Sequence, residues 1–173
     1  MTADISALPD DAPRRATAGF MVGHPARWIA LGFGSGLSPK APGTVGTLWA
    51  WAAFLVLDGW LDATQWAGVI GLSIAVGWWA CTRCAQHLHV ADPGAIVWDE
   101  VVAFWIVLWL LMPAPGWAQL AAFALFRYFD ITKPQPARYF DEHVKNGFGV
   151  MADDLVAAGY TLLALALLKV VLA

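Results

Sequence analysis

The stretch VVAFWIVLWLLMPAPGWAQLAAFALF, residues 101–126, decides the fold because it contains no Asp, Glu, Lys or Arg. Three further stretches, 41–57, 63–82 and 155–168, are equally free of charged residues. A membrane-spanning helix needs about 20 mostly apolar residues, with a range of about 17–25. A soluble helical bundle is the alternative interpretation, but a chain this short has too little polar surface to cover such stretches. We therefore expect an all-α, small polytopic membrane bundle.

The composition of the 173-residue chain points the same way. Hydrophobic residues make up 60% and charged residues 13%, whereas a soluble domain has about 45–50% and about 25%. The net charge of −3 disfavours a nucleic-acid partner, which would require clustered positive charge.

Glycine and proline divide the chain into about four or five apolar helices. We expect a flexible tail over 1–25, which lacks the apolar core of a signal peptide, and one helical domain over 26–173. The Gly- and Pro-rich part of 26–47 predicts a loop, and Asp92-Pro93 has the residues of a helix start. The expected helices cover 45–57, 64–85, 93–112, 117–129 and 153–172. The helix over 117–129 would span only about 20 Å. It could therefore re-enter the membrane from the same side or be strongly tilted.

The basic residues predict the orientation. With the N-terminus in the cytoplasm, nine of the ten Lys and Arg residues fall on the cytoplasmic side, and only Lys169 falls outside. This distribution follows the positive-inside rule. A multi-pass protein with its functional site at the cytoplasmic face is therefore expected.

Acidic residues from three separate segments would meet at that face: Asp99, Glu100, Asp130, Asp153 and Asp154. Carboxylates at membrane depth are costly and usually mark function. Crowded carboxylates require a cation, and hard oxygen ligands suit Mg²⁺. For some of these residues a structural role is the alternative. Asp153 or Asp154 could be a helix N-cap, and Asp130 could pair with Arg127 or Lys133.

The stretch GFGSGLSPKAPGTVGT (32–47) is the second candidate feature. Backbone N–H groups in such loops and at helix starts bind phosphate. No strand is readable before it, so a dinucleotide-binding fold is not indicated. A loop that only enters the membrane is the alternative. The candidate phosphate-binding residues are Gly34, Ser35, Ser38, Lys40, Thr44, Arg127 and Lys133.

The third feature is Cys81, Cys84, His87 and His89. These residue types can bind Zn²⁺, but their spacing fits no standard finger. Reduced, inert thiols are the simpler interpretation, and a disulfide is disfavoured by the expected cytoplasmic position.

Four stretches together resemble the phosphatidylglycerophosphatase A family: GFGSGLSPKAPGTVGTL (32–48), IVWDEVV (96–102), FRYFDITKPQPARYFD (126–141) and GVMADDLVAAG (149–159). The resemblance implies a magnesium-dependent phosphatase of bacterial glycerophospholipid synthesis. Such an enzyme hydrolyses phosphatidylglycerophosphate to phosphatidylglycerol and phosphate at the inner membrane. Ala103-Phe104 departs from the family pattern, where we would expect a glycine.

The resulting hypothesis gives each residue a role. Asp99, Glu100 and Asp153 or Asp154 would hold Mg²⁺, which lowers the pKa of an attacking water. Lys40, Arg127 and Lys133 would neutralise the phosphate oxygens. Asp130 could be a ligand, a base or a nucleophile, so the catalytic candidates are Asp99, Glu100, Asp130 and Lys133.

Two rival functions fit part of the pattern. A small ion or proton transporter would also collect carboxylates, but transport sites lie near the bilayer middle between repeated halves. A non-enzymatic membrane scaffold would explain the apolar stretches but not the co-located acids. The sequence leaves the oligomeric state open.

Overall fold

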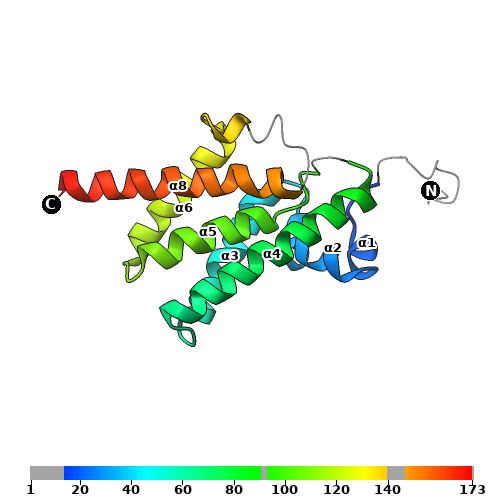
Figure 1. Ribbon diagram of the computed structural model, residues 1–173, viewed down its shortest axis with the longest axis horizontal. Coiled ribbons are helices and arrows are strands. Elements are labelled where there is room, and N and C mark those ends of the chain that lie inside the picture. Colours follow the sequence, from blue (N-terminus) through cyan, green and yellow to red (C-terminus); the bar gives the residue numbers. More distant parts are fainter. Residues whose placement is uncertain (1–13, 91–92, 140–146, 173) are drawn as a thin grey trace, which may run out of the picture.

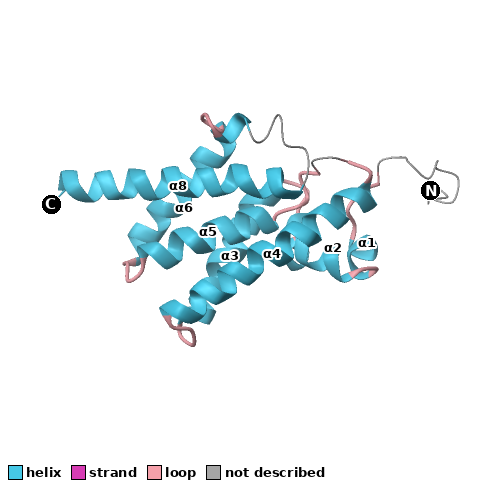
Figure 2. Ribbon diagram, viewed as in Figure 1, coloured by secondary structure: helices cyan, strands magenta, loops and turns pink. Residues whose placement is uncertain are grey.

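The computed structural model describes residues 14–90, 93–139 and 147–172, and within these ranges the chain is helical, without strands (Figures 1 and 2). The elements are α1 (Ala18–Val22), α2 (Pro25–Ala30), a 3-10 helix η2 (Gly32–Leu37), α3 (Pro42–Asp58), α4 (Ala63–Leu88), α5 (Trp98–Leu111), α6 (Gly116–Thr132) and α8 (Gly147–Leu172). The expectation of an all-α fold is confirmed.

Helix α5 forms the centre of the bundle. It packs against α3, α4, α6 and α8, and it lies between α4 and α8 in Figure 1. Its side chains are buried along most of its length, including Val101, Val102, Phe104 and Leu108, which have no exposed surface. A helix that is apolar all round belongs in the core of a bundle.

The outer helices expose large apolar side chains. On α8, Leu167 is 59% and Val170 77% exposed. Among the described residues, two segments are long and apolar enough to cross a membrane, Ala63–Leu88 and Met151–Val171. The expectation of four or five apolar membrane helices is thus confirmed only in part. Helix α5 has 14 residues, or about 21 Å, which is short of the roughly 30 Å hydrocarbon core of a bilayer.

Three predicted boundaries were wrong. The loop expected over the Gly- and Pro-rich stretch 32–47 contains η2, and α3 already begins at Pro42, since proline is favoured in the first helical turn. The helix expected from Pro93 begins at Trp98, and the proposed cap Asp92 lies outside the described residues. The last helix begins at Gly147 rather than at Asp153.

Close glycine contacts fix the start of α5. A Cβ atom on Gly36 would overlap the carbonyl oxygen of Ala95, and one on Gly46 would lie 2.7 Å from the Cβ of Val97. The backbone N–H of Val97 donates to the carbonyl of Ala30 at 2.9 Å. The glycines of 32–47 therefore let this segment dock against the residues that lead into α5.

The side chain of Trp98 anchors the same helix start on α4. A Cβ on Gly77 would lie 2.5 Å from the Trp98 ring, and the ring Nε1 donates to the carbonyl of Ser73 at 3.1 Å. Asp99 and Glu100 follow directly, so their position is set by packing on both sides.

Part of the segment expected as a tail is folded against the bundle. Thr17 caps α1 by accepting from the N–H of Phe20 at 3.1 Å. The N–H of Arg14 donates to the carbonyl of Leu88 at 2.9 Å. The rest of the expected tail, residues 1–13, lies outside the described residues.

Candidate functional site

Three carboxylates from two helices meet inside the bundle. Asp99 and Glu100 stand in the first turn of α5, and Asp154 comes from α8. One oxygen from each lies within 4.8 Å of the others. Asp99 is 8% and Asp154 3% exposed, so these like charges face one another with little water between them.

Arg127 of α6 balances part of this charge. Its Nη1 lies 2.5 Å from Oδ2 of Asp130 and 3.8 Å from Oε1 of Glu100. The same nitrogen donates to the hydroxyl of Thr47 at 3.3 Å. The ion pair of Asp130 with Arg127, given above as the structural alternative for Asp130, is therefore present. This pair lies at the edge of the acidic cluster.

Lys133 meets the other acid of α8. It ends α6 in a left-handed conformation, with φ of 43°, and its Nζ donates to Oδ2 of Asp153 at 2.6 Å. Asp153 therefore faces a cation, whereas its neighbour Asp154 completes the group of three. The N-cap interpretation of Asp153 or Asp154 is wrong, because α8 begins at Gly147.

The start of α3 closes one side of the cluster. A Cβ on Gly43 would overlap Oε1 of Glu100 and lie 3.1 Å from Nη2 of Arg127. The N-cap residue Ala41 has φ of 47°, and no side chain caps this helix. Since Pro42 has no N–H, Gly43 and Thr44 carry the N–H groups of this first turn that lack a partner within the helix.

The other phosphate-binding candidates make local contacts. The hydroxyl of Ser35 donates to the carbonyl of Gly32, and that of Ser38 to the carbonyl of Lys40, both at 2.8 Å. Gly34 has φ of 104° within η2, and Lys40 is exposed. These contacts stabilise the segment before α3, and a role in phosphate binding stays a prediction.

The cysteine and histidine residues have structural partners. Cys81 and Cys84 are free thiols, and both are buried. Nδ1 of His87 accepts from Nε of Arg27 at 3.2 Å, and His89 ends α4. In the described part of the chain, the carboxylate cluster is the one group of three or more side chains placed to share a metal ion, and the interpretation of the thiols as inert stays a prediction.

The residues of the cluster fit a hard divalent cation. All three ligands offer oxygen, and Mg²⁺ prefers oxygen ligands completed by water and substrate phosphate. Oε2 of Glu100 is buried and has no hydrogen-bond partner among the described residues. An unpaired buried carboxylate oxygen costs free energy unless a cation or water meets it.

Gly43 was missed from the sequence, and Thr47 was expected only as one of the hydrogen-bond donors of the Gly-rich stretch. Thr47 accepts the hydrogen bond from Arg127 and also donates to the carbonyl of Gly43 at 2.8 Å. Gly43 allows α3 to approach Glu100. Gly43 and Thr47 are four residues apart, so they share one face of a helix. This spacing was not recognised because 32–47 was expected to be a loop.

Comparison with known proteins identifies the family of the chain. The family model described as Phosphatidylglycerophosphatase A matches residues 28–169. A Haemophilus influenzae protein named phosphatidylglycerophosphatase A is 44% identical over 141 residues, which cover 81% of this chain and 86% of that protein. The Escherichia coli protein of the same name is 43% identical over 135 residues, covering 78% and 77%. No solved structure matches the chain significantly.

The helical bundle, the buried acids and these relatives together define a phosphoric monoester hydrolase. Among such enzymes, the chain belongs to the phosphatidylglycerophosphatase A family. The resemblance seen in its four motifs is thereby confirmed.

Proposed function

We propose that this protein hydrolyses the terminal phosphomonoester of phosphatidylglycerophosphate, giving phosphatidylglycerol and phosphate, with Mg²⁺ as cofactor. The observation that carries the proposal is the convergence of Asp99, Glu100 and Asp154 beside Arg127, in a chain of this family. A bound Mg²⁺ would polarise the phosphoryl group and lower the pKa of a bound water.

The residues around the cluster supply phosphate recognition. Arg127 offers guanidinium donors to phosphate oxygens, a geometry that suits planar charge-assisted bonds. The start of α3 lies beside Arg127 at Gly43, and we propose that the N–H groups of Gly43 and Thr44 in this first turn also bind the phosphate. Together these groups neutralise the charge that grows on the phosphoryl oxygens in the transition state.

Two acids act through neighbouring cations. Asp130 holds Arg127 at 2.5 Å, and Asp153 holds Lys133 at 2.6 Å. We assign Asp130 and Asp153 as positioning residues, and Asp99, Glu100 and Asp154 as the metal ligands. Water attacks phosphorus as the bond to the glycerol oxygen breaks, and the departing alkoxide takes up the proton that the water releases.

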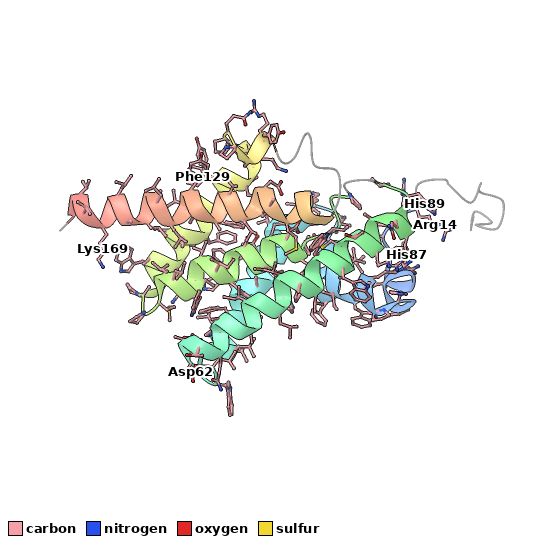
Figure 3. All side chains as sticks on the ribbon, viewed as in Figure 1. Arg14, Asp62, His87, His89, Phe129 and Lys169 are labelled. Atoms are coloured by element: carbon pink, nitrogen blue, oxygen red, sulfur yellow. The ribbon has the colours of Figure 1, made fainter. Side chains whose placement is uncertain are left out.

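We further propose a multi-pass protein of the bacterial inner membrane with its site on the cytoplasmic face. Figure 3 shows Arg14, His87 and His89 at one end of α4, with Asp62 at the other end. Lys169 lies far along α8. This separation supports the orientation indicated by the positive-inside rule.

Phosphate release by purified protein in detergent tests the reaction. We expect release from phosphatidylglycerophosphate with Mg²⁺, none with EDTA, and recovery when Mg²⁺ is restored. Asp58→Asn, which replaces a carboxylate outside the cluster, is the control and should release phosphate normally. It should also fold normally, since an asparagine oxygen can still accept the 3.0 Å hydrogen bond from Nε1 of Trp66. Folded protein without release would favour a transporter or a scaffold, and ion flux into liposomes would then separate these two.

Labelling of single cysteines in intact cells tests the orientation. Trp60, in the turn after α3, is 82% exposed, and Gln135, after α6, is also exposed. Because the native thiols are buried, a membrane-impermeant maleimide should react with W60C in intact spheroplasts and with Q135C only after permeabilisation. The opposite pattern would reverse the proposed orientation.

A further inference from the structure

An apolar groove runs along the surface between α3 and α5. Its volume is about 580 Å³. One end is formed by an exposed aromatic side chain of η2, and the walls come from the two helices. The lining residues are Phe33, Trp49, Ala52, Ala53, Val56, Leu57, Trp98 and Trp105.

Aromatic rings form a continuous floor. Phe33 stacks on Trp49 with ring centroids 5.4 Å apart, and Trp49 lies 6.4 Å from Trp98. Trp98 lies 5.8 Å from Trp105. The indole N–H groups of Trp98 and Trp105 donate to backbone carbonyls, at 3.1 and 2.9 Å. With these donors satisfied, the floor offers apolar contact and no free indole donor from these two rings.

The groove starts beside the candidate site and leads away from it. Trp98 precedes Asp99 in the chain, and the start of α3 touches Glu100 through Gly43. Farther along, Nε1 of Trp105 reaches the carbonyl of Ala50, so α3 and α5 leave the site side by side. From Trp49 to Leu57 the groove extends about 12 Å along α3, at about 1.5 Å per residue.

The outer border of the groove is apolar as well. Leu48, Leu55 and Val56 of α3 are 46%, 52% and 68% exposed, and Phe33 is 50% exposed. Phe33 also has φ of 54°, a left-handed conformation that is costly for a bulky residue. An exposed aromatic side chain kept in such a conformation is a marker of a functional site.

We infer that this groove binds one acyl chain of the phospholipid substrate, so that the headgroup phosphate reaches the carboxylates while the chain stays in an apolar environment. The inference rests on the proposed function. The occupant follows from the direction of the groove: a lipid whose phosphate lies at the starts of α3 and α5 has its apolar part directed along these helices.

Photolabelling tests the groove independently of catalysis. The probe is phosphatidylglycerol with a diazirine on one acyl chain, added to the protein in detergent micelles, and labelled peptides are identified by mass spectrometry. We expect labelling of peptides from α3 and α5 that contain groove residues. Ala52→Trp should reduce this labelling about tenfold, the loss expected when roughly two methylene groups lose their burial.

Matched variants keep the test specific. Ala52 is exposed, so a tryptophan there fills the groove without entering the core, and Ala53→Leu is a milder second filler. Leu167→Trp adds a ring to the exposed face of α8, outside the groove, and should leave labelling unchanged. Circular dichroism and size-exclusion chromatography confirm folding and report the oligomeric state.

Hydrolysis then shows what the groove contributes. Ala52→Trp should raise KM for long-chain phosphatidylglycerophosphate about tenfold while glycerophosphate, which has no acyl chain, is hydrolysed as by the unmodified protein. Equal labelling of Ala52→Trp and the unmodified protein would overturn the inference, as would a change of oligomeric state on filling the groove, because a second copy would then be the occupant. Groove labelling without phosphate release would instead refute the proposed function alone.

Discussion

Replacing Gly43 with alanine perturbs the candidate site without altering a charged residue. The new Cβ would overlap Oε1 of Glu100 and lie 3.1 and 3.2 Å from the two terminal nitrogens of Arg127. Arg127 cannot move freely, since it also contacts Asp130 and Thr47, so the Glu100 side chain must give way. We expect the Glu100 carboxylate to be displaced by about 1 Å, and a shift of this size at a catalytic group costs about a hundredfold in rate.

The effect on stability should be much smaller than the effect on rate. Gly43 lies in the first turn of α3, where the preference for alanine over glycine is at most the about 1 kcal/mol of a helix interior. This gain offsets part of the cost of the contact. The assay compares kcat/KM for phosphate release with the thermal unfolding midpoint of the same preparation, and isothermal titration measures Mg²⁺ affinity.

Gly71→Ala in α4 is the control, because no neighbouring atom lies within 4 Å of a Cβ at that position. It should unfold at the same or a higher temperature and retain full activity. If Gly43→Ala is folded and retains the full rate, the close approach of α3 to Glu100 does not matter for catalysis and the reasoning fails. Loss of the folded state would show that the contact is structural.

Three further results are expected. Asp99→Asn should abolish turnover with an unchanged helical spectrum, and a normal rate would remove Asp99 from the site. Gly36→Ala should lower the free energy of unfolding by about 1–3 kcal/mol, because its Cβ would overlap the backbone oxygen of Ala95; an unchanged unfolding midpoint would contradict this packing. Lys133→Met breaks the ion pair with buried Asp153 and should destabilise the protein by about 3 kcal/mol. Adding Asp153→Leu should recover much of the stability but not the activity, whereas further destabilisation would argue against the pair.

The sequence predicted the long helices because their signals are local. Uncharged stretches bounded by Gly, Pro and Asp placed α3, α4, α5, α6 and α8. The structure adds that Asp62 caps α4 by accepting from the N–H of Gln65 at 2.8 Å. Five acidic residues were also expected to converge, and the structure brings together Asp99, Glu100 and Asp154.

The errors arose where tertiary contacts override local propensity. Gly36 and Gly46 suggested a loop by composition, but they allow close docking against the segment from Ala95 to Val97. The same segment delays the start of α5 from Pro93 to Trp98, because Val97 bonds to Ala30 instead of continuing a helix. No local pattern reports a contact between residues so far apart in the chain.

The division of roles between Asp153 and Asp154 was equally beyond sequence reasoning. Adjacent residues on a helix point about 100° apart, yet the adjacent Asp99 and Glu100 both belong to the cluster, so helix geometry alone does not decide whether Asp153 or Asp154 joins them. The position of Lys133 at the end of α6 distinguishes the two residues. Its Nζ lies 2.6 Å from Asp153, which leaves Asp154 as the member of the cluster.

A cation bound by Asp99, Glu100 and Asp154, as proposed above, would also link folding to cation supply. Without a cation, three like charges in a nearly dry space oppose the folded state, so the region needed for chemistry weakens the bundle. A cation that binds only the folded protein at a hundred times its dissociation constant adds about 2.7 kcal/mol of stability. The amount of folded protein in a cell would then follow the free magnesium concentration, and variants that neutralise one of these acids would gain stability as they lose activity.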